Sequence, residues 1–238
     1  MPRPARPTPA VPAPAAAEAD ETRRRLLDAA GEVFAEQGFK DATVRDICTR
    51  AGANVAAIHY HFGDKQRLYA AAVRYCHDHT KRHALEADAP PDTAAPEQRL
   101  RAFVRGMLRG TLDDGKPAWH TKLMAREMNE PSAVLNQIVA EGIRPRFELL
   151  SAIVRGLVGP GADERVVVRC CRSVVGQCLF YHFARPVLVR LAPGERLDAS
   201  AVDALADHVA AFSLAGIRAA AKGATRTGGN GKRKGARR

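Results

Sequence analysis

The sequence predicts an all-α protein, and three observations support this. Apolar residues recur at helical spacing along most of the chain, no stretch has convincing strand character, and glycine and proline interrupt the pattern at short intervals. With 238 residues, 46% of them hydrophobic and 26% charged, the chain is long enough for one or two domains with a sizeable core.

The segment from residue 22 to residue 76 predicts four helices. The first ends at Gly38, the second begins after Thr43 and ends at Gly52, and the third begins after Asn54 and ends at Gly63. Threonine and asparagine are favoured N-caps, and glycine is the favoured residue just past a helix end. Short helices joined by tight turns are typical of a helix-turn-helix unit, which binds DNA.

The stretch NVAAIHYHFGDK (residues 54–65) contains the third predicted helix. On a helical wheel, Val55, Ile58 and Phe62 share one side, which we expect to be buried. Ala56 and Ala57 lie opposite, so the outer surface is thin enough to enter a major groove about 12 Å wide.

Tyr60 shares that outer side and is expected to contact base edges, while His59 and His61 fall on the two flanks, where they could donate to phosphates. Two metal ligands on one helix need a spacing of three or four residues, so this histidine pair does not predict a metal site. Lys65 and Thr43 lie at helix N-termini and are further phosphate candidates. The alternative is a surface helix without a ligand.

The run LLDAAGEVFAEQGFKDATVRDICTRAGANVAAIHYHFGDKQRLY resembles the DNA-binding domain of the TetR family of bacterial transcriptional regulators. This resemblance implies a three-helix helix-turn-helix domain followed by a helical ligand-binding and dimerisation domain. It also implies a DNA-contacting set, one member of which, His59, stands where the family often has tyrosine. The full expected set is Thr43, Arg45, Asn54, Ala56, Ala57, His59, Tyr60, His61 and Lys65.

Two later stretches, LMAREMNEPSAVLNQIVAEGIRPRFELLSAIVRGLVG and VVGQCLFYHFARPVL, resemble the C-terminal domain of the CecR-like branch of that family. The resemblance implies a repressor that binds a palindromic operator in double-stranded DNA and is released by a small-molecule effector. A pocket for that effector would lie between apolar helices. The candidate contacts, for which packing in the core is the alternative, are Trp119, His120, Leu123, Met124, Glu127, Phe180 and His182.

Two late segments are apolar over arcs wider than one core face needs, which favours a homodimer joined through a four-helix interface. The alternative is that both helices complete a monomeric core. The apolar residues are Val167, Cys171, Val174, Val175, Cys178 and Leu179 in the first segment, and Val202, Leu205, Val209, Phe212 and Ile217 in the second.

The formal net charge of +11 points to a polyanionic partner, but seven of the basic residues lie between Lys222 and Arg238, which leaves +4 for the rest. That tail either adds nonspecific DNA affinity or has no role in binding. The expected organisation is a disordered proline-rich arm (1–19), a DNA-binding domain (20–75), a ligand-binding and dimerisation domain (76–221) and a disordered basic tail (222–238).

Several other classes of protein are disfavoured. No stretch is apolar enough for a signal peptide or membrane span, so we expect a cytoplasmic protein without a membrane partner. No nucleophile, acid–base pair or cofactor loop stands in a credible setting, so neither an enzyme nor a cofactor is expected.

The five cysteines form no C-x-x-C motif; buried thiols are expected, with a redox switch as the alternative. His79 and His83 are four residues apart on a predicted helix, but their surroundings are charged. We therefore expect them to lie on a solvent-exposed face rather than in a metal site. A nonspecific architectural DNA binder is the rival function.

Overall fold

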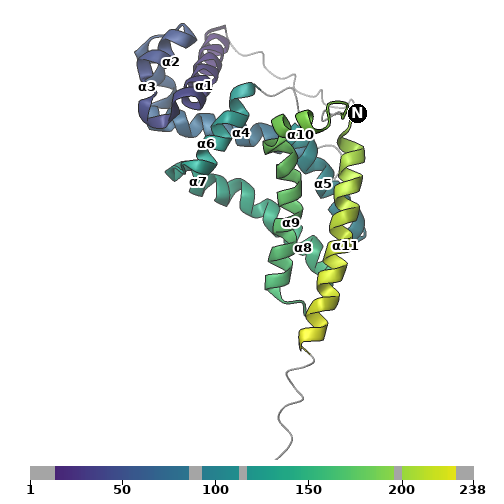
Figure 1. The fold of residues 1–238 in the computed structure, drawn as a ribbon. Helices are drawn as coiled ribbons and strands as arrows, with labels where there is room; N and C mark the ends of the chain where they lie inside the picture. The colour runs from purple at the N-terminus through teal and green to yellow at the C-terminus, as the bar shows by residue number, and fades with distance from the viewer. Residues whose placement is uncertain (1–13, 86–92, 113–116, 196–199, 229–238) are drawn as a thin grey trace, which may run out of the picture. The chain divides into compact units, whose positions relative to one another are not determined.

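The computed structural model describes residues 14–85, 93–112, 117–195 and 200–228, and these ranges contain helices and no strand. The all-α prediction is therefore confirmed. The chain forms two compact units: the first comprises Met1–Cys76 and Pro117–Val134, and the second His77–Lys116 and Leu135–Arg238. Figure 1 shows the helices of each. The helix at 118–129 groups with the N-terminal helices, although the sequence placed it in the second domain, because its side chains pack in the first unit's core.

In the first unit, α1 (Pro14–Asp41) packs against α2 (Val44–Ala51) and α3 (Val55–Phe62). The helix geometry of α1 is broken at Gly38, whose φ of 84° is accessible to glycine at little cost. The prediction that the first helix is interrupted at Gly38 is thus confirmed. The start differs: α1 begins at Pro14, inside the segment expected to be a disordered arm.

The buried side of α3 is narrower than the helical wheel predicts. Ile58 and Phe62 are buried, but Val55 is 46% exposed, so its predicted burial is wrong. Val55 is the first residue of the helix, one turn before Ile58, where the core formed with α1 and α2 no longer covers it. Periodicity predicts direction around a helix axis but not how far along the axis a neighbour extends.

Close packing joins α1 to α6 (Ala118–Asn129) in the same unit. The Trp119 ring lies directly over Gly31, where an added Cβ would come within 2.3 Å of it. Any side chain at position 31 would therefore displace the indole. Tyr75 of α4 (Lys65–Leu85) stacks on the same indole, with 6.3 Å between ring centroids.

A buried carboxylate supplies the polar link between α4, α6 and the turn that follows α6. Tyr69 donates its hydroxyl hydrogen to Glu127 Oε2 over 2.6 Å. The other carboxylate oxygen accepts from Ser132 N at 2.9 Å and from Ser132 Oγ at 2.8 Å. Glu127 has no exposed surface, so these bonds replace the water that a charged group would otherwise require.

In the second unit, α5 (Pro96–Leu112), α8 (Arg144–Val158), α9 (Glu164–Phe183) and α11 (Val202–Gly228) pack on one another around an apolar core (Figure 1). Ion pairs reinforce the outside of this bundle: Arg105 and Arg109 both lie within 3.2 Å of Asp203. The short helix α10 (Arg185–Leu191) follows α9 after Ala184, and Pro186 occupies its first turn, where a proline is tolerated.

A π-helical turn, η1 (Val139–Ile143), lies between α7 (Ala133–Ile138) and α8. Pro145 explains it, because a proline supplies no N–H to the carbonyl four residues back and its ring clashes with that carbonyl. The helix widens instead, and the N–H of Arg144 bonds to the carbonyl of Val139, five residues back. The chain from Ala133 to Val158 is thus continuously helical but irregular.

The wide apolar arcs of the two late helices serve mainly the unit's own core. Val167, Cys171, Val174 and Cys178 of α9 are all buried there. Phe212 of α11 is the clear exception, with 65% of its surface exposed. The last helix continues to Gly228, past the expected start of the tail at residue 222, and residues 229–238 lie outside the described part. None of the described helices is long and apolar enough to cross a membrane.

Replacing Tyr69 with phenylalanine should lower the free energy of unfolding by about 1–3 kcal/mol, because a buried carboxylate oxygen loses its donor. Urea unfolding at neutral pH measures this. Tyr75→Phe is the matched control, since that hydroxyl has no hydrogen bond to another residue that the structure describes, and it should change stability by less than about 0.5 kcal/mol. Equal stability of the two variants would contradict the role of the Tyr69–Glu127 bond.

The effect of Tyr69→Phe on the free energy of unfolding should depend on pH. Burial, followed by the hydrogen bond to Glu127, raises the pKa of Tyr69 above its ordinary value. A raised folded-state pKa means that the stabilisation is complete below the unfolded-state pKa of about 10 and is lost as pH rises through the folded-state pKa. The stability difference between wild type and Tyr69→Phe should therefore be constant at lower pH and shrink above about pH 10.

Candidate nucleic-acid interface

Two capped helix starts fix the backbone of the candidate interface. Thr43 Oγ1 accepts from Asp46 N at 3.1 Å and donates to Asp46 Oδ2 at 2.7 Å, which caps α2. Asn54 Oδ1 accepts from Ala57 N at 2.9 Å, which caps α3. Between them, Gly52 adopts the left-handed conformation with φ 60° and ends α2. Each cap is a local pattern, which is why the sequence located both correctly.

The outer side of α3 carries Ala56, His59 and Tyr60, all of them exposed. Tyr60 is 81% exposed, and the ring of His61 stands edge-on to it with 4.9 Å between centroids. Ile58 and Phe62 anchor the opposite side in the core. The helix thus presents an aromatic ring between small residues on a surface that its own unit does not cover.

Two of the residues expected to reach phosphates, His59 and Lys65, contact backbone carbonyls. His59 Nδ1 lies 2.7 Å from Gly63 O, and because a carbonyl only accepts, Nδ1 carries the hydrogen. Nε2 then donates to a phosphate only when the ring is protonated. Lys65 Nζ donates to Lys40 O at 3.3 Å and lies 4.8 Å from the centroid of the Phe39 ring, which orients the ammonium group but leaves further donors.

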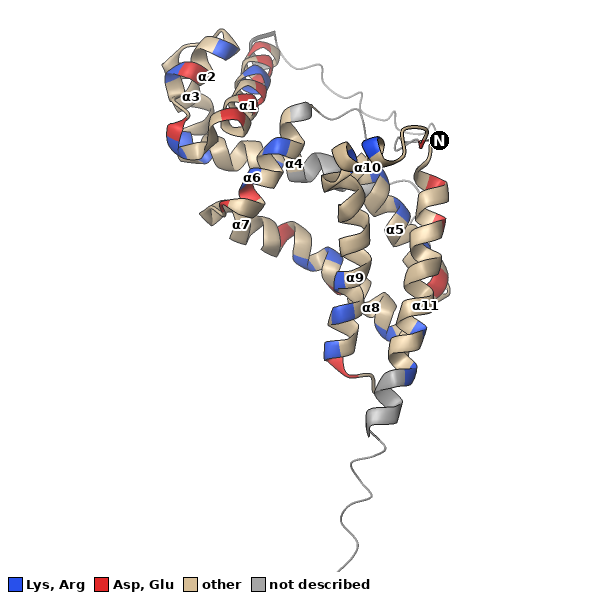
Figure 2. Cartoon of the chain, viewed as in Figure 1, with Lys and Arg blue, Asp and Glu red and all other residues tan. Residues whose placement is uncertain are grey.

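Both basic and acidic residues occur along α1 and α2 (Figure 2), and some of the basic residues here are paired with acids. Arg50 pairs with Glu36 at 2.9 Å and with Glu32 at 3.5 Å. Arg45, on the same helix, is exposed and has no ion pair within the described part of the chain. Arg45 is therefore the arginine of α2 that retains an uncompensated charge.

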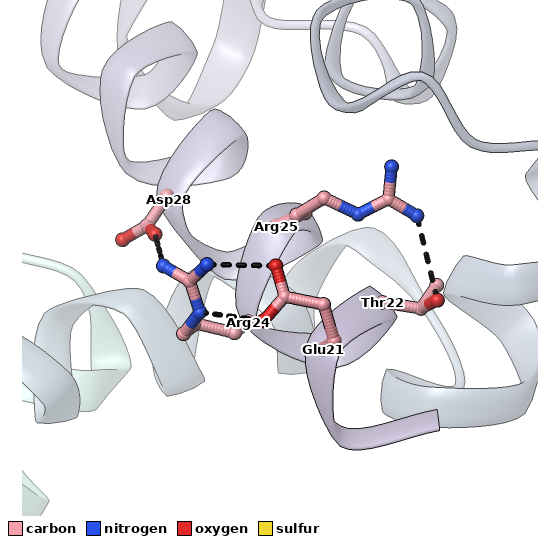
Figure 3. A network of polar contacts seen from close by, with 5 residues as sticks. All are labelled: Glu21, Thr22, Arg24, Arg25 and Asp28. Atoms are coloured by element: carbon pink, nitrogen blue, oxygen red, sulfur yellow. Dashed lines mark hydrogen bonds and ion pairs between the residues drawn. The ribbon is translucent and has the colours of Figure 1, made fainter. Parts of the chain in front are cut away.

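Arg25 is a candidate that the sequence analysis missed. Figure 3 shows that Arg24 is held between Glu21 and Asp28, whereas the guanidinium of Arg25 points away from them and donates to the hydroxyl of Thr22, at 3.5 Å. Its guanidinium also lies near Gly52, in the turn between α2 and α3. The signal was the run of three arginines at 23–25, since consecutive helical residues point about 100° apart and cannot share the same partners.

The seven residues expected to contact an effector do not all lie in one unit. Trp119, His120, Leu123, Met124 and Glu127 belong to the first, whereas Phe180 and His182 belong to the second. His120 packs edge-on against the Trp119 ring, with 4.2 Å between centroids. The carboxylate of Glu127 is fully used by Tyr69 and Ser132. In the second unit, Phe180 is exposed and His182 Nδ1 donates to Thr111 O at 2.9 Å.

The thiols are free and buried, as the sequence predicted. Burial raises the pKa of Cys170 and Cys171, and that of Cys178 to about 12. Thiolate is the reactive form, so these values disfavour a redox switch. No group of three potential metal ligands occurs among the described residues; the side chains of His79 and His83 lie outside them.

Comparison with known proteins identifies the class. Residues 26–72 match the family described as bacterial regulatory proteins, tetR family, and residues 96–217 match the HTH-type transcriptional dual regulator CecR, C-terminal domain. The chain therefore belongs to the TetR family and is a DNA-binding transcriptional regulator; proteins of this family are regulators and not enzymes. Within the family, its C-terminal half is the domain found in CecR.

Three relatives illustrate the similarity. CecR of Shigella flexneri is 26% identical over 179 residues, covering 71% of this chain and 79% of the relative. The transcriptional repressor NicS of Pseudomonas putida is 27% identical over 210 residues, covering 85% and 95%. The crystal structure of AibR, in complex with isovaleryl coenzyme A and operator DNA, superposes with a TM-score of 0.54 at 18% identity, covering 81% and 96%.

Arg25→Met should weaken DNA binding and lower the slope of log affinity against log salt by about one, as expected for one lost phosphate contact. Arg24→Met is the matched control, because Arg24 is already paired with two acids and should leave the slope unchanged. Titrations of labelled DNA at several salt concentrations measure both variants. Equal slopes for Arg25→Met and wild type would exclude the contact.

Proposed function

We propose that this regulator is a repressor that binds a palindromic operator as a homodimer and is released by a small-molecule effector. The observation that carries the proposal is the exposed side of α3, where Tyr60 stands 81% exposed between residues with small side chains. A DNA-binding regulator acts where the chromosome is, which supports the expected cytoplasmic location. The proposed DNA contacts are Thr43, Arg45, Asn54, Ala56, Ala57, His59, Tyr60, His61 and Lys65, with Arg25 added.

The contacts divide by chemistry. Ala56 and Ala57 let the axis of α3 approach the floor of a major groove, so that Tyr60 reaches base edges. Arg45 and Lys65 supply positive charge for the phosphates that fix position on the duplex. The preference for one DNA sequence would then depend on the few side chains that contact bases. The affinity for DNA would depend on the larger number that contact phosphates.

An exposed apolar surface on the second unit supports dimerisation. Phe212 is 65% exposed, and its neighbours on the outer face of α11 are small residues that permit close helix approach. Monomeric proteins rarely expose contiguous apolar surface of this kind, whereas interfaces require it. The exposed residues involved are Ala204, Ala211, Phe212, Ala215, Gly216 and Ala219 of α11, and Gly176, Phe180 and Phe183 of α9.

Release by an effector is supported by analogy. AibR was crystallised with both isovaleryl coenzyme A and operator DNA, and NicS is a repressor. An effector can shift a regulator only by favouring one state over the other. Four of the five candidate contacts of the first unit, all except the partly exposed Met124, are buried, which supports a packing role for them. Phe180 and His182 belong to the helical bundle of the second unit, and we place the effector site there.

The direct test is a footprint of the full chain on the DNA flanking its own gene, at about 150 mM salt with excess unrelated competitor, which suppresses purely ionic binding. A protected, near-palindromic site is the expected result. Uniform or absent protection across candidate promoters would overturn the proposal and favour a nonspecific DNA binder.

Tyr60→Ala should reduce operator affinity about 10- to 100-fold, the range for a good base contact, without changing the melting temperature, because the side chain is exposed. Fluorescence anisotropy with operator and scrambled duplexes measures this. Tyr60→Phe separates the hydroxyl from the ring: full affinity would assign the contact to the ring. Undiminished operator preference in Tyr60→Ala would refute a base contact.

Phe212→Glu should convert the dimer to a monomer and weaken operator binding by about 10²-fold or more, since the two half-sites are no longer bound together. Ultracentrifugation and operator titration measure the two effects. Ala152→Glu adds the same charge at an exposed position of α8 and should change neither. A dimer that survives Phe212→Glu would rule out this face as the interface.

A further inference from the structure

Arg146, in the second unit, buries two of its three guanidinium nitrogens without a hydrogen-bond partner among the residues that the structure describes. Its Nε and Nη2 atoms are fully buried, and no acceptor within the described part of the chain bonds to them. Elsewhere in the unit arginines pair with acids; for example, Arg155 reaches Glu164 at 2.7 Å and Arg218 reaches Glu97 at 3.2 Å. Buried polar groups in folded proteins almost always have a partner, so these two nitrogens of a partly exposed side chain require an explanation.

The helix register places Arg146 on the inner side of α8. It precedes Leu150 by four residues and Ile153 by seven, and both of these are buried in the bundle core. Phe147, its neighbour, packs against the same core. The guanidinium therefore lies on the apolar face of the helix rather than on its solvent face.

Two contacts show at which end of the bundle the first turn of α8 lies. Ser151 Oγ of α8 lies 3.6 Å from Cys171 Sγ of α9. The two helices are joined by a short loop and pack together, so they are antiparallel, and residues before Ser151 lie beside residues after Cys171. Gly156, near the end of α8, meets the ring of Pro96 at the start of α5. The first turn of α8 thus lies toward the ends of α5 and α9.

At that end, His182 donates to Thr111 O and joins α9 to α5. Helices α5, α8 and α9 contact one another in this unit, and the core that they share is apolar. Met107, Phe147 and Tyr181 are partly buried against this core.

The cost of this arrangement indicates a function. A buried charge without a counter-ion destabilises the fold, and the same desolvation lowers the pKa of Arg146. The backbone immediately before it is also irregular, because the π-helical turn Val139–Ile143 ends just ahead of α8. Single π-helical turns occur frequently at functional sites. The two irregularities occur within one turn of each other.

We propose that Arg146 binds the carboxylate of an apolar organic acid, and that this acid is the effector. The inference rests on the proposed function for its regulatory meaning. One guanidinium matches one carboxylate in charge and in planar, two-pronged hydrogen-bonding geometry. A phosphate dianion would need further cations, and Arg109, another arginine of the bundle, is already paired with Asp203. The apolar lining would contain the rest of the acid.

The test uses the full chain with benzoate and octanoate as probes and with benzamide and octanamide as their uncharged counterparts. Calorimetry should show binding of the acids to wild type and binding at least about 10-fold weaker for the amides. Arg146→Met should weaken acid binding by about 10-fold or more, and Arg146→Lys by less, because lysine keeps the charge but not the paired donors. Arg144→Met, at an exposed position two residues earlier, is the matched control and should bind as wild type does.

Stability without a probe distinguishes a binding role from a structural one. Removing an unpartnered buried charge should leave the melting temperature of Arg146→Met equal to or above that of wild type. A marked drop in melting temperature, with acid binding unchanged, would assign Arg146 to the fold and overturn the proposal.

The remaining outcomes separate this inference from the proposed function. If no acid binds to a protein that still protects its operator, the carboxylate site is refuted and the regulator stands. If the acids bind through Arg146 without weakening operator binding, they are not effectors and the proposal fails as stated. If the acids bind through Arg146 but no operator is found, the proposed function fails while the site remains.

Discussion

Glu127 has no exposed surface, and its carboxylate joins the hydroxyl of Tyr69 to the backbone and hydroxyl of Ser132. A charge buried this deeply is tolerated only when each oxygen has a donor, so the three groups constrain one another. The bonds fix α6 against α4 and set where the turn before α7 begins. At the start of α6, Trp119 occupies the space over Gly31. The position of α6 within the first unit therefore depends on one carboxylate and one missing side chain.

Local patterns made most of the DNA-binding unit predictable from the sequence. The caps Thr43 and Asn54 bond to residues three positions away, and Gly52 ends α2 by its own backbone conformation. The outward direction of Tyr60 follows from helical periodicity alone. The burial of Val55 did not follow, because it depends on how far the neighbouring helices extend along α3. Features that depend on residues within four positions of one another could be predicted from the sequence. Features that depend on packing against another helix could not.

The effector candidates show the same limit. Glu127 combined a charge with an apolar setting and so indicated a ligand contact, but its partner Tyr69 lies 58 residues away and could not be foreseen. Arg146 was overlooked for the opposite reason. The sequence of α8 alternates apolar and polar residues as in any amphipathic helix, and nothing local shows that no acid reaches Arg146. A missing partner is a property of the folded chain.

The residues that break the rules of folding are the ones to which we assign function. Tyr60 and Phe212 expose large rings that a core would stabilise, and Arg146 buries a charge that water would stabilise. Selection for stability alone would remove all three, since hydrophobic burial favours the reverse arrangement in each case. A DNA duplex, a second subunit and an organic acid would each supply the missing partner. The energy that the isolated chain loses at these positions is then recovered on binding, which makes the three binding events favourable and allows one to influence another.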